Sequence, residues 1–237
     1  MGTPRFHGIL LDLFGTVISM GKPGARVESL RAMADALAVE PNAFVRTWGQ
    51  SFDDRSRGRL GTLEETIHHL MIGLGHRPSP DQVQRAIRIR VEFSRAVLQS
   101  DARVLRALDE LRRAGCRLEI VSDTSEETPR LWPETELAAR FNVTVFSCQV
   151  GIRKPEPAIY RLALERLRLD PSRCAFVGDG GSHELSGATA VGLAAFRYYF
   201  PGEQQDPSDR VDPEGDWTGP TLHDLRELLV ASPDGVR

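Results

Sequence analysis

The fold of this chain is decided by the stretch Gly8-Ile9-Leu10-Leu11-Asp12-Leu13-Phe14-Gly15-Thr16-Val17. A short apolar run carries one carboxylate, Asp12, and ends at once in the turn residues Gly15 and Thr16. Such a run is typical of a parallel strand that is buried on both faces. Because ligands of open α/β sheets bind beyond the carboxyl ends of the strands, we expect Asp12 to act as a nucleophile or a metal ligand. Phe14 stands two positions later, where a second acid would help.

The composition is that of an ordinary soluble globular protein. The 237 residues are 41% hydrophobic and 27% charged, which is enough for a sizeable core and a smaller insert. The formal net charge of −3 gives no basic field that would attract nucleic acid. No apolar run is long enough to span a membrane, and the N-terminus lacks the apolar region of a signal peptide.

The three cysteines, Cys116, Cys148 and Cys174, are too widely spaced to predict a zinc site or a disulfide framework. We therefore expect reduced, buried thiols and a cytoplasmic location. The sequence leaves a monomer and a homodimer open.

A helical block separates the first strand from the rest of the predicted sheet. Helical spacing and capping residues indicate helices at 26–39, 42–52, 62–74 and 79–98. No strand-like segment interrupts them, so we predict an all-α-helical insert at 19–96. The remaining residues, 1–18 and 97–237, are predicted to form the core domain.

Beyond position 100, the core alternates between helix and strand. Strands are expected at 117–123, 143–147, 174–179 and 194–199, and helices at 101–114, 129–141, 157–169 and 184–191. This alternation predicts an α/β fold with a parallel sheet flanked by helices. Residues 200–220 are expected to form a surface loop, either a rim over the site or a disordered segment. Thr221 is expected to cap a last helix at 222–231.

Polar residues recur at or just after the ends of the predicted strands. They are Asp12, Ser122, Lys154, and Asp179 with Glu184. Alone, each has an ordinary explanation as a helix cap or an exposed side chain. Three carboxylates in one crevice, however, would repel one another. A bound divalent cation removes that conflict, and carboxylate oxygens with water are ligands suited to Mg²⁺.

The same residues suit a phosphate ester as substrate. Mg²⁺ and Lys154 would together offset the charge of a phosphate dianion. The Ser122 hydroxyl and the amides after it, at the start of a helix, would form an anion site. Attack of Asp12 on phosphorus would give an aspartyl-phosphate, and the metal, Lys154 and Ser122 would stabilise its transition state.

Four segments of the chain resemble the motifs of the haloacid dehalogenase superfamily of hydrolases. In chain order they are Asp12-Leu13-Phe14-Gly15-Thr16, Ile120-Val121-Ser122, Arg153-Lys154-Pro155-Glu156-Pro157 and Val177-Gly178-Asp179-Gly180-Gly181-Ser182-His183-Glu184. Their order and spacing match, and the resemblance covers nearly the whole chain. It implies a Rossmann-like core, and it identifies the helical insert with the family's α-helical cap of the first type.

The resemblance also implies a role for each motif residue. Asp12 would be the nucleophile, Ser122 would bind the phosphate or the leaving group, and Lys154 would stabilise the intermediate. The groups that would hold Mg²⁺ are Asp12, the main-chain carbonyl of Phe14, Asp179 and Glu184.

The first motif departs from the phosphatase pattern and leaves three functions open. Phosphatases of the family usually have Asp in place of Phe14, which protonates the leaving group and then activates water, help that is typically worth about 10²–10⁴-fold. The 2-haloacid dehalogenases of the family have an aromatic residue there, but they need no metal and lack the pair Gly178-Asp179. We expect a Mg²⁺-dependent phosphatase of a small phosphorylated metabolite. The alternatives are a 2-haloacid dehalogenase, whose substrate is a halogenated acid, and a slow or non-catalytic protein that binds a phosphorylated ligand.

Asp123 follows Ser122 at a position where the family commonly has Asn. It could exchange a proton with the substrate in place of Phe14, or it could cap a helix. The residues expected to contact the substrate are Phe14, Thr16, Asp123 and Arg57.

The helical insert is expected to select the substrate. Arg55, Arg57 and Arg59 lie in a segment expected to turn toward the core. One of them could pair with a second anionic group of the substrate, or all three could be exposed. Trp48 and Phe52 are one helical turn apart and are expected in the core of the insert. Surface positions are expected for His68, His69 and His183.

Overall fold

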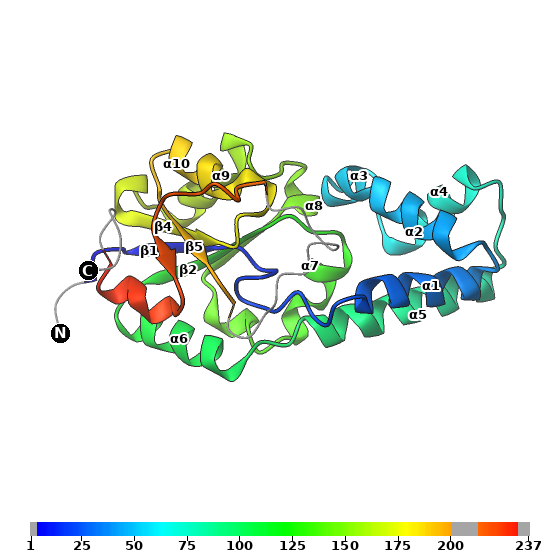
Figure 1. Cartoon of the computed structure of the whole chain (residues 1–237), viewed down its shortest axis with the longest axis horizontal. Helices are drawn as coiled ribbons and strands as arrows, with labels where there is room; N and C mark the ends of the chain where they lie inside the picture. Colours follow the sequence, from blue (N-terminus) through cyan, green and yellow to red (C-terminus); the bar gives the residue numbers. More distant parts are fainter. Residues whose placement is uncertain (1–3, 201–212, 232–237) are drawn as a thin grey trace.

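The computed structural model describes residues 4–200 and 213–231, which form an α/β core and a helical lobe (Figure 1). The core holds a six-stranded sheet with the order β3-β2-β1-β4-β5-β6, in which every neighbouring pair is parallel. The strands are β1 (Gly8–Leu11), β2 (Arg117–Ser122), β3 (Val143–Phe146), β4 (Cys174–Gly178), β5 (Ala194–Tyr198) and β6 (Thr221–Leu222). The predicted fold class is confirmed.

Strand β1 lies in the middle of the sheet because its residues are apolar on both faces. Ile9 and Leu11 pack on one face with α6 (Ala102–Arg113). Leu10 packs on the other face with α9 (Pro157–Leu167) and α10 (Glu184–Ala190). Since β1 pairs with both β2 and β4, the carboxyl ends of these three strands meet at one edge of the sheet.

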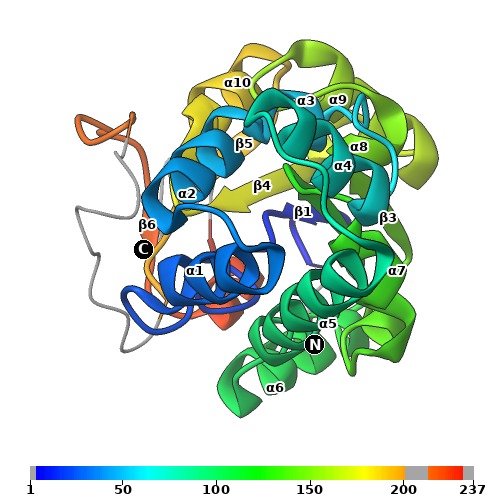
Figure 2. The same ribbon diagram turned by 90° about the vertical axis from the view of Figure 1, so that its right-hand side faces the viewer.

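Five helices between β1 and α6 form the helical lobe, with a hydrophobic cluster of its own. They are α1 (Ala25–Leu37), α2 (Pro41–Gln50), α3 (Phe52–Ser56), α4 (Leu63–Gly73) and α5 (Pro80–Val97). Helices α1 and α5 lie side by side and connect the lobe to the core (Figures 1 and 2). Helix α4 begins, as predicted, at Thr62 with Glu65 three residues later, and the two form a capping box. Helix α5 begins with a second capping box, formed by Ser79 and Gln82. These reciprocal bonds satisfy amides that have no partner within the helix.

The chain between β2 and β3 forms the broken helix that the sequence predicts. It consists of α7 (Glu127–Leu131) followed by the short 3₁₀ turns Trp132–Glu134 and Ala138–Arg140. Pro133 lacks the amide N–H that a continuing helix would need. A further short helix, α8 (Ser147–Val150), begins where the predicted strand at 143–147 was expected to end.

The prediction of a last helix at 222–231 is wrong. Thr221 and Leu222 instead form β6 on the outer side of β5, and only a 3₁₀ turn, Leu225–Leu229, follows. Asp224 and Glu227 form the capping box of this turn in place of Thr221. The reason is that Leu222 is fully buried when it extends the sheet, and β6 satisfies backbone groups at the edge of β5. Most of the predicted loop at 200–220 lies outside the described residues.

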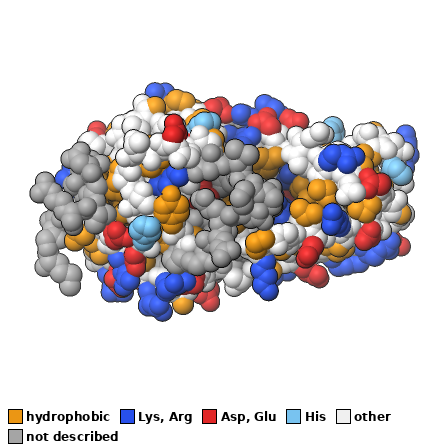
Figure 3. Space-filling model, viewed as in Figure 1, with side chains coloured by type: hydrophobic (Ala, Val, Ile, Leu, Met, Phe, Trp, Pro, Cys, Tyr) orange, Lys and Arg blue, Asp and Glu red, His pale blue; other side chains and the backbone are white. Residues whose placement is uncertain are grey.

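Charged side chains of both signs occur on the described surface (Figure 3). On the face shown in Figure 3, basic side chains lie among acidic ones. In the described ranges, no helix combines the length and the apolar character needed to cross a membrane. Cys116, Cys148 and Cys174 are all free thiols.

Candidate active site

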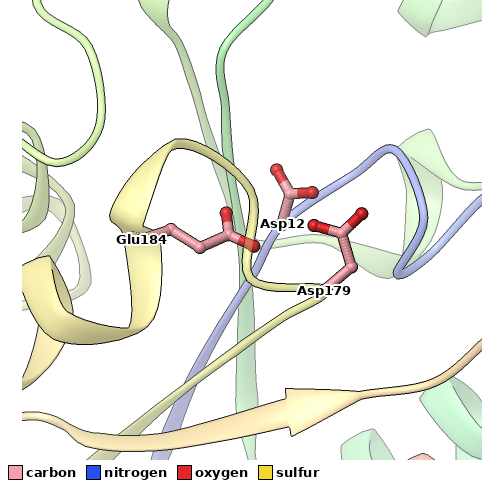
Figure 4. A group of neighbouring side chains, drawn as sticks. All are labelled: Asp12, Asp179 and Glu184. Carbon is pink, nitrogen blue, oxygen red and sulfur yellow. The ribbon is translucent and has the colours of Figure 1, made fainter. Parts of the chain in front are cut away.

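Three carboxylates converge at the carboxyl edge of the sheet (Figure 4). Asp12 follows β1, Asp179 follows β4, and Glu184 begins α10. One carboxylate oxygen of each lies within 4.8 Å of the others. The parallel pairing of β1 with β4 continues into this site, because the Asp12 amide donates to the Val177 carbonyl at 2.9 Å.

Two glycines allow these carboxylates to approach the backbone. A Cβ atom on Gly15, whose φ is +82°, would lie 2.3 Å from Oδ2 of Asp179. A Cβ atom on Gly178 would lie 2.2 Å from Oε1 of Glu184. Amides of the turn after β4 then hold both acids, donating to Asp179 at 3.0 Å and to Glu184 at 3.1 Å. The glycines of the first and fourth motifs therefore make room for the acids.

Lys154 places positive charge beside two of these acids. Its buried ammonium group contacts both Asp12 and Glu184. Burial alone would lower the pKa of Lys154, but Asp12 and Glu184 raise it above its ordinary value, so the side chain stays charged. One lysine among three carboxylates leaves the cluster short of positive charge. The all-oxygen donor set therefore fits a hard divalent cation such as Mg²⁺.

Two predicted site residues contribute buried hydroxyls. Ser122 ends β2, and Thr16 lies in the loop after Asp12. Both are fully buried, and neither hydroxyl has a hydrogen-bond partner among the described residues. An unsatisfied buried hydroxyl is unfavourable, so both positions are suited to a bound ligand or water.

A cavity of about 600 Å³ is lined by residues of both the helical lobe and the core. On the core side it brings together the predicted residues Asp12, Phe14, Asp123 and Lys154. The half-buried ring of Phe14 offers this cavity no group that transfers a proton. Ser122 and Thr16 do not line the cavity.

Asp123 faces the cavity and does not cap a helix. The following helix, α7, has no side-chain cap. One oxygen of Asp123 accepts the amide N–H of Lys154 at 3.0 Å, and the other pairs with Arg153 at 3.4 Å. Burial raises the pKa of Asp123 more than Lys154 and Arg153 lower it. The geometry therefore argues against the helix cap, and proton exchange with a substrate stays a prediction.

The arginines that line the cavity from the lobe do not include the predicted Arg57. Arg57 does not line it, because its guanidinium pairs with Asp53 at 3.1 Å and with Glu156 at 2.7 Å. Arg55 does line it, although this side chain is only 7% exposed, and Arg90 of α5 joins it there.

The two aromatic residues of the insert behave differently from each other. Trp48 is buried in the lobe as expected, and its ring also reaches the cavity. The prediction for Phe52 is wrong, since it is 37% exposed and lines the cavity. The predicted helix at 42–52 ends at Gln50, so Phe52 begins a new helix and leaves the inward face of α2. Exposed positions are confirmed for His68, His69 and His183.

Sequence patterns single out neither Arg90 nor Glu214, although both serve the site region. Arg90 lies four residues after the buried Ala86 and four before the buried Ser94, so helical spacing alone could have placed it inward. Glu214 accepts the amide N–H groups of the two residues after Glu184, at 2.9 and 2.7 Å. It therefore holds the start of α10 in place. No local pattern signals this contact, because Glu214 lies far away in the sequence.

The fold and the site residues are typical of one class of hydrolases, and the sequence matches the same class. Residues 6–192 match the haloacid dehalogenase-like hydrolase family, so the chain belongs to that family. It is 28% identical to the glyceraldehyde 3-phosphate phosphatase of Methanopyrus kandleri, over 86% of this chain and 88% of that protein. It also matches the bifunctional epoxide hydrolase 2 of Sus scrofa at 35% identity, but spans only 13% of that protein's length.

Two solved structures share the fold. One is a haloacid dehalogenase family enzyme from Bacteroides thetaiotaomicron in complex with magnesium and inorganic phosphate, with a TM-score of 0.65 and 17% identity over 86% of this chain and all of that one. The other is a 2-haloacid dehalogenase from Pseudomonas syringae pv. tomato, with a TM-score of 0.65 and 23% identity over 94% of this chain and 96% of that one.

Proposed function

We propose that this chain is a Mg²⁺-dependent phosphatase that hydrolyses a small phosphorylated compound through an aspartyl-phosphate on Asp12. The observation that carries the proposal is the group of Asp12, Asp179 and Glu184, whose carboxylate oxygens lie within 4.8 Å of one another. A dehalogenase that needs no metal has no use for this acid group. The similarity to a glyceraldehyde 3-phosphate phosphatase over most of both chains supports the same function.

The reaction would take place in two steps at the core end of the cavity. A carboxylate oxygen of Asp12 attacks phosphorus, and the bond from phosphorus to the ester oxygen breaks. Lys154 and the Ser122 hydroxyl stabilise the charge on the phosphoryl oxygens. The departing oxygen would take a proton from Asp123, which lines the same cavity as Asp12. Asp123 then accepts a proton from the water that attacks phosphorus, which releases phosphate and restores Asp12.

The groups that would hold Mg²⁺ are Asp12, the carbonyl of Phe14, Asp179 and Glu184. When bound, the ion supplies positive charge against the phosphate oxygens. The helical lobe, residues 19–96, would act as the cap over the substrate, since it lines the cavity opposite the core residues. A cytoplasmic location and a monomeric or homodimeric state stay predictions from the sequence.

The test is hydrolysis of p-nitrophenyl phosphate and a panel of phosphorylated metabolites, with Mg²⁺ and with a chelator. We expect phosphate release that requires Mg²⁺. Asp123→Asn should lower kcat by about 10²-fold, because proton transfer is typically worth about 10²–10⁴-fold. The absence of Mg²⁺-dependent turnover on every phosphate ester would contradict the proposal.

A dehalogenase is the second candidate, because the Phe14 ring lines the cavity beside Asp12. Halide release from 2-chloropropionate, measured with and without a chelator, separates the two reactions. A protein that only binds phosphorylated ligands would be saturated by beryllofluoride and would release neither phosphate nor halide.

A further inference from the structure

The lobe end of the cavity contains a second group of buried charges, none of which belongs to the four motifs. Arg55 comes from α3, Arg90 from α5 and Glu127 from α7, and all three line the cavity that Asp12 also lines. Both guanidiniums lie over the ring of Trp48, at 4.5 Å for Arg55 and 5.3 Å for Arg90. The cavity therefore has a cationic site at the lobe as well as the catalytic group at the core.

Arg55 is a buried cation that bonds only to neutral oxygens. Within the described part of the chain, its guanidinium donates to the hydroxyls of Ser51 and Ser125 and to the Trp48 carbonyl. Burial lowers the pKa of Arg55 to about 10, and the neighbouring Arg90 lowers it further in spite of Glu127. Arg55 thus remains charged at neutral pH with no carboxylate in hydrogen-bond contact.

Arg90 is only partly satisfied by its ion pair. Its Nε donates to Glu127 at 2.6 Å, and the two side chains are 13% and 4% exposed. Burial alone would raise the pKa of Glu127, but Arg90 and Arg55 hold it below its ordinary value, so Glu127 is charged. The Nη1 atom of Arg90 is buried and has no hydrogen-bond partner among the described residues.

These contacts leave the lobe end short of negative charge. Among the described residues at this end, the guanidiniums of Arg55 and Arg90 have one carboxylate, Glu127, between them. A buried charge is unfavourable unless it is paired and hydrogen-bonded. A ligand carboxylate or phosphate would satisfy the Arg90 donor and balance Arg55 through charge-assisted hydrogen bonds.

The cavity wall also indicates what joins the two ends of the ligand. Much of the wall is apolar or aromatic, as the side chains of Phe14, Leu30, Trp48, Phe52, Phe93 and Val97 illustrate. This part of the wall suits a hydrocarbon or an aromatic ring. The ligand body is therefore expected to be apolar.

We propose that the substrate is a phosphate monoester whose apolar body ends in a second anionic group, which binds Arg90 and Arg55 at the lobe end. This inference rests on the proposed phosphatase function for the position of the phosphate. It adds the substrate class and the residues that select it.

Binding of inert phosphonates tests the inference independently of turnover. Calorimetry with Mg²⁺ would compare benzylphosphonate, 4-carboxybenzylphosphonate, the matching primary amide and the matching bisphosphonate, with longer linkers as a further series. We expect at least one carboxylated or doubly phosphorylated member to bind about 10- to 100-fold more tightly than the amide, as one charge-assisted hydrogen-bond site allows. The two anionic series distinguish a carboxylate from a phosphate as the second group.

The double variant Arg90→Met with Glu127→Gln removes the Arg90 donor without leaving a buried carboxylate unpaired, and it leaves Arg55 in place. We expect it to weaken the preference for the second anion and to leave binding of benzylphosphonate nearly unchanged. Arg88→Met is the matched control, because Arg88 is an exposed arginine on the same helix and does not line the cavity. In the unmodified protein, 3-phenylpropanoate should weaken the binding of the anionic ligand, which tests the site even if the double variant does not fold.

Two outcomes would overturn the inference: equal binding of the anionic and amide series, or a preference of undiminished size in a folded double variant. Preferential binding without hydrolysis of the corresponding phosphate esters would contradict the phosphatase function alone. Hydrolysis of simple esters without any such preference would contradict the substrate class alone.

Discussion

The two ends of the cavity differ in how their buried charges are balanced. At the core end, Lys154 contacts the carboxylates of Asp12 and Glu184. At the lobe end, and among the residues that the structure describes, Arg55 bonds only to neutral oxygens. Arg90 there has one carboxylate partner, Glu127, and an Nη1 atom without a hydrogen-bond partner. Since unpaired buried charge is unfavourable, the two ends are suited to different tasks. The core end suits a cation and a reacting phosphate, whereas the lobe end suits an anion.

The largest effect should come from the nucleophile at the core end. Asp12→Asn is expected to reduce kcat for phosphate ester hydrolysis by about 10⁴-fold or more, because the covalent step loses its attacking carboxylate. Asp81→Asn, at an exposed position in α5, is the control for removal of an acid. Substantial turnover by folded Asp12→Asn would show that the reaction does not depend on this carboxylate.

The core end could be predicted from the sequence because its residues lie at or directly after the ends of strands. Asp12 and Asp179 come one residue after buried strands, and Ser122 ends another. Once the strands are parallel, their carboxyl ends must meet at one edge of the sheet. The contacts of Lys154 with Asp12 and Glu184 needed the structure, since no spacing rule joins residues so far apart in the chain.

The lobe end could not be predicted in this way. Which arginine faces the cavity depends on the break between α2 and α3 and on the packing of α5, and neither is a local property of the sequence. The sequence pointed to the segment of Arg55 and Arg57, but the choice between them depends on tertiary partners. Arg57 meets Glu156 of the core, whereas Arg55 turns inward to Ser125.

The next largest effect is expected when an acid is introduced in place of Phe14 at the core end of the cavity. Phe14→Asp places a carboxyl group on the cavity wall near Asp12, and we expect kcat for phosphate esters to rise by up to about 10²-fold, at the lower limit of acid–base help. Phe14→Asn is the matched control, because asparagine is polar and about the size of aspartate but does not exchange a proton at neutral pH. If both variants turn over at the same rate, Phe14 does not limit the reaction.

The side chain of Glu119 tests whether the other buried acids of the core also avoid an unbalanced charge. This β2 residue is fully buried, and neither carboxylate oxygen has a hydrogen-bond partner among the described residues. Burial raises the pKa of Glu119 from 4.5 to about 9, so at neutral pH the group avoids an unpaired charge by keeping its proton. Arg55 at the lobe end, in contrast, remains charged at neutral pH, which is why it requires an anion.

The pH dependence of stability should reveal this proton. Because the folded pKa of Glu119 lies above the unfolded one, the unfolded state loses its proton first. The free energy of unfolding therefore falls as pH rises from about 5 to 9, by at most about 1.4 kcal/mol per pH unit. Relative to wild type, Glu119→Gln should gain up to about 4 kcal/mol between pH 5 and pH 8 in denaturant titrations. Glu165→Gln, an exposed control on α9, should show no such gain. A parallel pH dependence in wild type and Glu119→Gln would contradict the buried proton.

The smallest effect is expected at Arg57, the arginine that the sequence favoured as a substrate contact. Its ion pair with Glu156 is partly exposed and links the lobe to the core outside the cavity. Exposed pairs contribute little, so Arg57→Met should change KM by less than about threefold and should leave the preference for a second anion intact. The change in KM that Arg57→Met causes should become smaller at higher salt concentration, because salt screens the ion pair. Arg57→Met could instead lose binding of the carboxylated phosphonate selectively, by as much as the Arg90 and Glu127 double variant is expected to lose. That result would place the second anion at the edge of the lobe. Calorimetry of both variants with the same ligand series therefore decides which arginines select the substrate.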